Sequence, residues 1–128
     1  GSNANGQIGD GSFSNRNVPT LVYGLKGAVK VTTGAGHTCA LVEGGTVACW
    51  GRNDQGQLGD GGTFTKIIPV DVAGLDGVIA VVAGDQHTCA LRKNGEMRCW
   101  GANGSGQLGN GKKGGIETTP QSVIGSAP

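Results

Sequence analysis

The pattern of hydrophobic positions along the chain predicts short β-strands. Residues 78–83 form a nearly unbroken apolar run rich in β-branched side chains, which is typical of a strand buried on both faces. Two further segments, 87–92 and 96–100, are separated by Lys-Asn-Gly, and Asn-Gly at the end of a short loop indicates a β-hairpin. Pro69 suits an edge strand at 68–73, because proline cannot donate a hydrogen bond to a strand ladder.

The same pattern returns after fifty residues, which indicates a repeat architecture. The motif Gly-x-Asn-x-x-Gly-Gln-(Ile/Leu)-Gly occurs at 1–9, 51–59 and 101–109, His-Thr-Cys-Ala-Leu at 37–41 and 87–91, and Cys-Trp-Gly at 49–51 and 99–101. Each unit of such a repeat buries its apolar face against a neighbouring unit. The predicted strands are 18–23, 28–33, 37–42 and 47–50, then 68–73, 78–83, 87–92 and 97–100, and finally 120–124.

Four short strands per period, with connections short enough for antiparallel pairing, predict one blade of a β-propeller. We therefore expect an all-β chain that forms part of one repeat domain over residues 1–128. Its blade-like units are expected at 18–50 and 68–100, with partial units at 1–17 and 101–128. A solenoid of parallel β-coils is the competing repeat fold, but its coils are shorter and do not contain a tight hairpin in every unit.

Composition agrees with short strands and excludes several classes of function. The chain has 27 glycines, and only 4% of its residues are aromatic and 15% charged, which disfavours long helices and suits strands joined by tight turns. The net charge of +1 offers neither the basic stripe that nucleic-acid binding needs nor a polybasic membrane surface. No apolar run approaches the roughly 20 residues that span a bilayer. We therefore expect neither nucleic-acid binding nor membrane insertion.

The four cysteines lie on the arms of the two predicted hairpins. If residues 93–95 form the turn, counting outward along both arms places Cys89 opposite Cys99, and the equivalent count places Cys39 opposite Cys49. Directly opposed residues of an antiparallel pair bring their Cβ atoms within disulfide range. We expect one disulfide in each unit, and therefore an oxidising compartment.

A metal site is one alternative to these disulfides, and unpaired buried thiols are another. His37, Cys39 and Cys49 offer three zinc-compatible ligands, but residues two apart on a strand stand about 7 Å apart and a fourth ligand is missing. A catalytic role for His37 or His87 is disfavoured, because a nucleophile and its base should occur once and not once per repeat. We therefore predict no metal, no cofactor and no catalytic residue, and we expect both histidines to hydrogen-bond between strands or units.

The glycine-rich loops superficially resemble ligand-binding loops. Residues 104–109 lack the Lys-Ser/Thr ending of a nucleotide-binding loop and do not open a helix. Asp54 and Asp60 suggest a calcium site, but their copies in the next unit are Gly104 and Asn110. We therefore expect the glycines to supply left-handed turns, and the Asn and Gln side chains to bind loop backbone groups.

In chain order, Gly-x-x-His-Thr-Cys-Ala-Leu and Cys-Trp-Gly-x-Asn-x-x-Gly-Gln-Leu-Gly resemble the repeat of the regulator of chromosome condensation family, over essentially the whole chain. The cysteine-bearing form is similar to bacterial, often extracellular, members. The resemblance implies a seven-bladed β-propeller, of which this chain holds about two and a half repeats, and a role as a binding platform. The resemblance carries over no functional residue.

Specificity is expected in the part of the long loop that varies between units. Residues 13–17 align with 63–67 and with 113–117 but differ from them in sequence, and such variable loops on a fixed framework are where partners bind. Sequence drift on a solvated loop is the alternative. The candidate partner-binding residues are Phe13, Asn15, Arg16, Phe64 and Lys66.

We expect a non-catalytic scaffold for protein–protein interaction, located extracellularly or at the cell surface, with the periplasm as an alternative. The resemblance implies two other functions: a secreted enzyme inhibitor like the β-lactamase-inhibiting propeller, and a guanine-nucleotide exchange factor for a small GTPase. The chain has few aromatic residues for the first function and nothing similar to an exchange wedge or basic tail for the second. Two units alone leave open sheet faces, so we also expect self-association.

Overall fold

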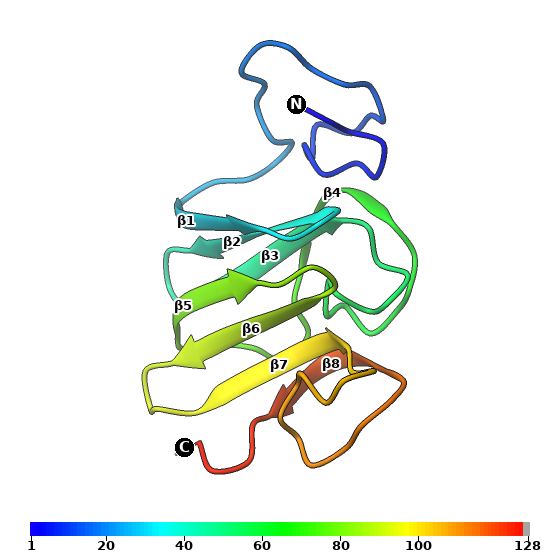
Figure 1. Cartoon of the computed structure of the whole chain (residues 1–128). Helices are drawn as coiled ribbons and strands as arrows, with labels where there is room; N and C mark the ends of the chain where they lie inside the picture. The colour runs from blue at the N-terminus through cyan, green and yellow to red at the C-terminus, as the bar shows by residue number, and fades with distance from the viewer. Residues whose placement is uncertain (127–128) are drawn as a thin grey trace.

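The structure is a computed structural model that describes residues 1–126 and contains two four-stranded antiparallel β-sheets. The sheets stack face to face, and within each sheet the strands follow chain order (Figure 1). The first sheet consists of β1 (Ala28–Thr33), β2 (His37–Val42), β3 (Thr46–Gly51) and β4 (Lys66–Asp71). The second consists of β5 (Val78–Ala83), β6 (His87–Arg92), β7 (Met97–Ala102) and β8 (Ile116–Ser122). Within the described residues, nothing forms a helix long and apolar enough to cross a membrane.

The strands and hairpin registers largely follow the hydrophobic pattern. The predicted strands 28–33, 37–42, 78–83 and 87–92 form at the expected residues, while those at 47–50, 68–73, 97–100 and 120–124 overlap β3, β4, β7 and β8. In the first hairpin Val42 pairs with Thr46, which places Cys39 opposite Cys49. The second hairpin has the same register over its cysteines. Tight turns therefore set the cross-strand pairs as expected.

The strand predicted at 18–23 does not form, because among the described residues no strand lies beside it to pair with. In the complete first sheet, Gly51 pairs with Lys66 at the end of β3. The copies of these residues fifty positions earlier are Gly1 and Arg16, and they do bond: the Arg16 amide donates to the Gly1 carbonyl at 3.0 Å, and the Gly1 amino group binds the Arg16 carbonyl. Gly1 and Arg16 therefore form one pair of a β-ladder, and a single pair does not make a strand.

The strand after each long loop joins the sheet that precedes the loop. β4 pairs with β3, and β8 pairs with β7. The sheets therefore span residues 28–71 and 78–122, and not the groupings 18–50 and 68–100 expected from the sequence. The physical reason is that the loop returns the chain to the open edge of the strand it has just left, and consecutive strands usually pair.

The third copy of the long loop is one residue longer than the second. Gly51 pairs with Lys66, whereas Gly101 pairs with Glu117, so the separation increases by one residue. The ungapped alignment of residues 63–67 with 113–117 is therefore wrong by one position. Two consecutive glycines, Gly114 and Gly115, both adopt positive φ angles in the longer loop, where glycine carries no steric penalty.

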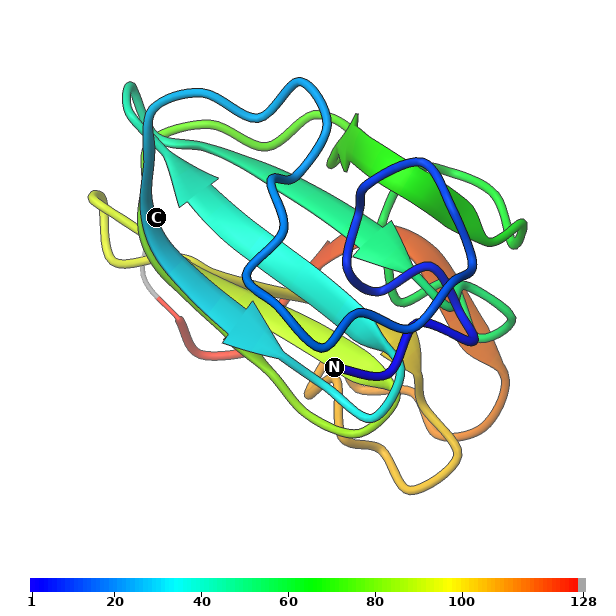
Figure 2. The same cartoon turned by 90° about the horizontal axis from the view of Figure 1, so that it is seen from above.

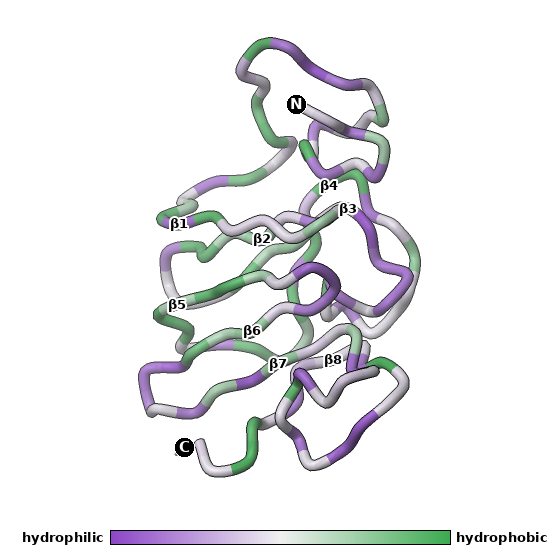
Figure 3. Tube along the Cα trace, in the orientation of Figure 1, coloured by the Kyte–Doolittle hydropathy of each residue, from purple (hydrophilic) through white to green (hydrophobic). Residues whose placement is uncertain are grey.

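The hydrophobic core lies between the two sheets. Leu41, Val47 and Val72 come from the first sheet and its exit, and they cluster with Val78, Val81 and Ala90 of the second sheet. Hydrophobic residues concentrate along strands such as β5, whereas hydrophilic residues gather in the loops at the ends of the sheets (Figure 3). The alternating faces of the strands thus produce the sheet-on-sheet burial that a repeat unit needs.

The two ends of the strands carry different connections (Figure 1). The long loops that follow β3 and β7 lie on one side, which we call the long-loop side, together with the turns between β1 and β2 and between β5 and β6. The turns of the two hairpins and the connection from β4 to β5 lie on the opposite side, the hairpin side. Residues before β1 lie over the outer face of the first sheet (Figure 2).

Candidate functional site

Each long loop is organised by one buried asparagine. In the second copy, Asn53 Nδ2 donates to the carbonyls of Gly62 and Phe64 and to Asp60 Oδ1, each at 3.1 Å, while its Oδ1 accepts from the Leu58 amide at 2.9 Å. Asn3 and Asn103 occupy the same position in the other copies, and all three side chains are buried. A glutamine side chain in each loop also binds the backbone amide two residues before it. Gln57 Oε1, for example, accepts a hydrogen bond from the Gln55 amide. These side chains hold the loop backbone, as expected from the sequence.

Each loop also accepts hydrogen bonds from the sheet that follows it in the sequence. The Gln57 carbonyl accepts hydrogen bonds from Thr88 Oγ1 and Trp100 Nε1, both at 2.9 Å. The same bonds recur one unit earlier, where the Gln7 carbonyl accepts from Thr38 and Trp50 at 2.8 Å. The two tryptophans therefore pack between units, as expected.

The close approach of loop and indole requires glycine at the loop tip. Gly59 has φ +70°, and a Cβ atom there would lie 2.7 Å from Trp100 Nε1. Gly9 has the same relationship to Trp50, with φ +79° and a distance of 2.6 Å. Any side chain at these two positions would separate the loop from the sheet that it locks.

His37 joins the two sheets through a buried hydrogen bond. Its Nε2 atom lies 3.0 Å from Thr88 Oγ1, and only 1% of the residue is exposed. Because the single Thr88 hydroxyl proton is donated to the Gln57 carbonyl, His37 donates to Thr88 from Nε2. Burial, assisted by the charge of His87, lowers the pKa of His37 to about 4. The histidine therefore links neighbouring units, as the repeat pattern predicted.

All four cysteines form the two disulfides expected from the register. Cys39 is bonded to Cys49 and Cys89 to Cys99, each pair with a Cα–Cα distance of 4.1 Å. The first bridge faces the closed interface between the sheets, where both cysteines are fully buried. The second occupies the equivalent face of the second sheet, and Cys89 is only half-buried there. Disulfide-bonded sulfurs are unavailable as thiolate nucleophiles or zinc ligands.

The candidate partner-binding residues divide into two groups. Phe13 and Phe64 are 58% and 79% exposed, and both lie on long loops. Asn15 and Arg16 act within the first loop: Asn15 Oδ1 accepts from the Asn3 amide at 2.8 Å, and Arg16 Nε donates to Asp10 Oδ2 at 2.8 Å. Lys66 begins β4 and is half-buried. Asn15 and Arg16 are exposed as well, so the two phenylalanines are the exposed apolar groups of this set.

The acidic side chains of the second loop are engaged within the loop. Asp54 accepts two hydrogen bonds of 2.8 Å from Arg52, which lower the pKa of its carboxyl group. Asp60 Oδ1 accepts from the Asn53 side chain and from the Gly62 amide. Within residues 1–126, no three His, Cys, Asp or Glu side chains are grouped so as to hold a metal ion.

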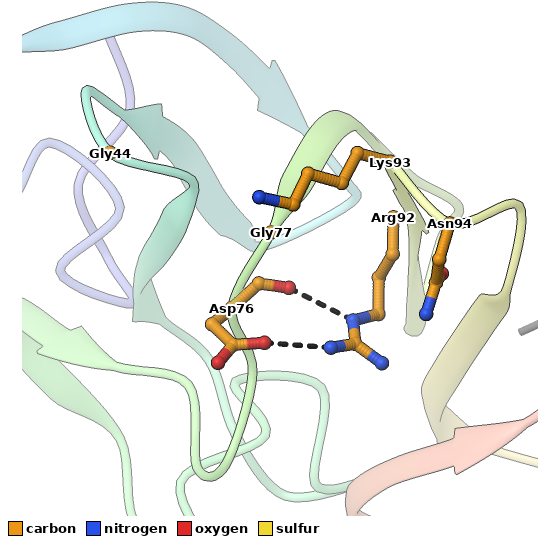
Figure 4. Close-up of a pocket in the computed structure, with 6 residues that line it drawn as sticks. All are labelled: Gly44, Asp76, Gly77, Arg92, Lys93 and Asn94. Carbon is orange, nitrogen blue, oxygen red and sulfur yellow. Dashed lines mark hydrogen bonds and ion pairs between the residues drawn. The ribbon is translucent and has the colours of Figure 1, made fainter.

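A polar cluster on the hairpin side has no counterpart in the first sheet. Glu96 Oε1 accepts from Arg92 at 2.6 Å and from Arg98 at 2.9 Å, and Glu96 Oε2 accepts from Ser122 at 2.6 Å. These bonds, with that from Ser122 foremost, lower the pKa of Glu96 to about 2. Arg92 also binds the carbonyl and carboxylate of Asp76 in the connection between the sheets (Figure 4).

This cluster borders a hollow of about 280 Å³, lined by Gly44, Asp76, Gly77, Arg92, Lys93 and Asn94 (Figure 4). Sequence reasoning did not single out these residues. Comparison of the two copies carries a signal, because Arg92, Glu96 and Arg98 stand where the first unit has Val42, Thr46 and Ala48. The guanidinium of Arg92 is committed to Asp76 and Glu96, so its role here is to attach the connection to the second hairpin.

Comparison with solved structures places these sheets in a known architecture. Prp20p from Saccharomyces cerevisiae matches with a TM-score of 0.77 and 20% identity over 94% of this chain and 32% of that chain. Human WBSCR16 matches with a TM-score of 0.71 and 24% identity over 94% of this chain and 33% of that one. Yeast RCC1 (Prp20) bound to Kap60 matches with a TM-score of 0.68 and 22% identity, over 80% of this chain and 27% of that one. The chain thus spans about a third or less of these proteins, and the sheets correspond to about two propeller blades.

Comparison with sequence families gives the same assignment. Two models of the regulator of chromosome condensation (RCC1) repeat match the chain, one at residues 28–57 and 78–107, and the other at 1–41 and 44–91. None of the curated proteins compared with the chain matches it. The matched residues include the disulfide-bearing hairpins, the histidines and the loop asparagines. The chain therefore belongs to the regulator of chromosome condensation (RCC1) repeat family and forms about two blades of its β-propeller.

Proposed function

We propose that the chain is a non-catalytic scaffold that binds a protein partner through the long loops that carry Phe13 and Phe64. The observation that carries this proposal is the exposure of Phe13 and Phe64 on loops whose backbones are held by buried Asn3 and Asn53. Exposed aromatic side chains lose little entropy on binding and contribute large contact areas. Because the loops are held by internal hydrogen bonds, they present these rings without first having to fold.

Structural relatives support a protein partner. The structure of Prp20p is described with its binding properties to Gsp1p and histones, and yeast RCC1 (Prp20) is described bound to Kap60. Those partners are proteins, which agrees with a binding platform in this fold. The identity of the partner of the present chain must follow from its own loops, since a propeller fold alone does not determine function.

The two disulfides favour an oxidising environment. We place the protein extracellularly or at the cell surface, with the periplasm as the alternative. The exposed apolar side chains on the outer sheet faces, such as Val31 and Val82, also favour self-association. Self-association involves the sheet faces, whereas the proposed partner binds the loops, so the two kinds of binding are separable.

The proposal is tested by capture of proteins from an extracellular extract on the immobilised, disulfide-bonded chain. The variant carries both Phe13→Ser and Phe64→Ser, and Val29→Ser serves as the matched control because Val29 is a similarly exposed apolar residue on β1. We expect a protein, other than the chain itself, that is retained by the wild type and by the control and lost from the double variant. Retention of the same proteins by all three would contradict binding through the long loops.

The two alternative functions give different results in direct assays. An exchange factor accelerates nucleotide release from a small GTPase. A secreted inhibitor reduces the activity of the hydrolase that it captures. The scaffold proposal predicts no acceleration of nucleotide release and a captured protein whose activity is unchanged.

A further inference from the structure

We propose that Asn103 accepts an asparagine-linked glycan only while the chain is unfolded, and that this glycan and the native fold of the loop between β7 and β8 exclude each other. The enzyme class is an oligosaccharyltransferase, and the donor is an oligosaccharide on a lipid pyrophosphate. The occurrence of the reaction in a cell rests on the extracellular location proposed above, because exported chains meet such transferases. The chemistry at Asn103 does not depend on that location and is tested on the purified chain.

The sequence contains one acceptor motif for such a glycan. Asn103 is followed by Gly104 and Ser105, which gives Asn-x-Ser with a residue other than proline in the middle, and no other asparagine has serine or threonine two positions later. This motif is typical of exposed loops in secreted proteins. Its asparagine is here the buried residue that organises the loop, so the motif and the fold make opposite demands on one side chain.

The folded loop leaves no room for a sugar on Asn103. The residue is only 1% exposed. Its Nδ2 atom donates to the Asn110 side chain at 3.3 Å and to the Lys112 carbonyl at 3.2 Å. Its Oδ1 atom accepts from the Leu108 amide at 3.1 Å. The loop therefore encloses Nδ2, which is the atom that a transferase must reach.

Glycan transfer would also remove a hydrogen atom that the loop uses. In the reaction, Nδ2 forms a bond to C1 of the first sugar, the bond between C1 and the pyrophosphate oxygen breaks, and the lipid pyrophosphate leaves. Nδ2 loses one proton to a base of the transferase. The product keeps a single N–H group, whereas Nδ2 in the folded loop donates to two acceptors, on Asn110 and Lys112.

The backbone of the motif is held as well. The Asn103 carbonyl accepts from the Gly106 amide at 3.1 Å, which closes a turn over the motif, and from the Gly114 amide at 2.7 Å. The Asn103 amide donates to the Gly115 carbonyl at 3.0 Å. A transferase must draw the asparagine away from the surrounding chain, so it can act only after these bonds have opened.

The burial of this asparagine comes from its own loop and recurs in the other copies. Asn3 and Asn53 are both 0% exposed. The loop of Asn53 is covered by the second sheet, through the bonds from Thr88 and Trp100 to the Gln57 carbonyl. A further unit packed on the second sheet would cover the loop of Asn103 in the same way and would not expose the residue.

Ser105 completes the motif, but the loop does not need its hydroxyl group. Its copies are Asn5 and Gln55, and in all three loops the backbone amide of this residue donates to the side chain of the glutamine two positions later at 2.8 Å. Ser105 is exposed, and within residues 1–126 its hydroxyl forms no hydrogen bond. Ser105→Gln therefore installs the residue of the second copy, removes the acceptor motif and retains the loop.

The acceptor claim is tested with a purified oligosaccharyltransferase and a lipid-linked oligosaccharide acting on two forms of the full chain. One form is folded and disulfide-bonded. The other carries its cysteines as S-sulfonates, which a thiol can later remove; these charged groups keep the chain unfolded because Cys39 and Cys49 are fully buried in the fold. We expect mass spectrometry to find a glycan on Asn103 of the unfolded form, with transfer to the folded form slower by about tenfold or more. Ser105→Gln should receive no glycan in either form.

The exclusion claim is tested by refolding the glycosylated and the unmodified chains in a thiol–disulfide buffer. The amides of Leu108 and Gly114 bond Asn103 in the fold. We expect both amides to exchange slowly with solvent in the unmodified chain and rapidly in the glycosylated chain, and equal protection would overturn the exclusion.

Two other results would overturn the acceptor claim. Transfer to the folded form as fast as to the unfolded form would show that the loop does not shield Asn103. Absence of transfer to the unfolded wild type, or transfer to unfolded Ser105→Gln, would show that Asn103 is not the acceptor. Partner binding through Phe13 and Phe64 is tested separately by the capture experiment, so failure of one proposal leaves the other standing.

Discussion

His37 and Thr88, which lie fifty-one residues apart in the sequence, form a buried hydrogen bond of 3.0 Å between the two sheets. Thr88 passes its proton to the carbonyl of Gln57, which also accepts from Trp100. One histidine, one threonine, one tryptophan and one loop carbonyl therefore connect the first sheet to the second. A structural role at such a junction explains why these residue types recur in the sequence.

Removal of the Thr88 hydroxyl should destabilise the fold. Thr88→Val leaves His37 Nε2 and the Gln57 carbonyl without one partner each in a buried site, and each lost partner costs about 1–3 kcal/mol. Thr38→Val is the matched control, because Thr38 donates the equivalent bond to the Gln7 carbonyl but, among the described residues, bonds no histidine. Urea unfolding should give a larger loss of stability for Thr88→Val than for Thr38→Val, and equal losses would contradict the histidine link.

Mild acid should weaken the junction between the sheets. Burial lowers the pKa of His37 to about 4, below the usual 6.5, so the unfolded chain binds more protons than the folded chain between these values. Stability is therefore full above pH 6.5 and falls as the pH drops toward 4, by about 2 kcal/mol between pH 7 and pH 5. Urea midpoints at the two pH values measure this loss, and His37→Gln should reduce it. If the His37→Gln variant kept the full pH dependence, another titrating group would be responsible for the loss of stability.

A still lower pH should weaken the hydrogen bonds that Glu96 accepts from Ser122 and the two arginines. Hydrogen bonds from Ser122 and the two arginines lower the pKa of Glu96 to about 2, so the stability it contributes is present above pH 4.5 and is lost as the pH falls toward 2. Glu96→Gln should remove this part of the pH dependence. Chemical denaturation at pH 4.5 and pH 3 compares the two proteins, and parallel curves would show that Glu96 is not responsible.

The two disulfides should differ in their resistance to reduction. Cys39 and Cys49 are fully buried between the sheets, whereas Cys89 is half-buried on the open face. A mild reductant followed by alkylation should label Cys89 and Cys99 first. Mass spectrometry of the labelled peptides gives the order. Each bridge closes a short loop and contributes about 3 kcal/mol in the chain-entropy description, so reduction of both should lower the urea midpoint strongly.

The sequence predicted those features of the fold that depend on short-range geometry. The Lys-Asn-Gly turn determines the register of the second hairpin, and that register places Cys89 opposite Cys99. The apolar run 78–83 forms a strand, as its β-branched composition predicts, but the strand is not buried on both faces: Ile79 and Val82 are 52% and 60% exposed. The histidine pattern likewise indicated a link between units.

Features that depend on distant partners were not predicted. The segment 18–23 has the composition of a strand but forms none, and the one ladder bond nearby joins Arg16 to Gly1, because strand formation depends on a neighbour and not on propensity alone. The acceptor that joins loop to sheet is the backbone carbonyl of Gln57, and a backbone atom leaves no residue-type signal. Asn15 and Arg16 bind groups within the first loop, and these bonds depend on how the loop folds. Aligning the repeat copies does not reveal the fold of the loop.

The most direct test of a scaffold that binds through its long loops is the affinity of the captured partner for three purified proteins: the wild type, the Phe13→Ser/Phe64→Ser double variant, and Lys93→Ala on the hairpin side. Truncation of an aromatic anchor costs about 2 kcal/mol or more, which corresponds to about thirtyfold in Kd. We predict a loss of at least this size for the double variant and an unchanged Kd for Lys93→Ala. An unchanged Kd for the double variant, with weaker binding by Lys93→Ala, would contradict the account and place the partner at the hairpin side.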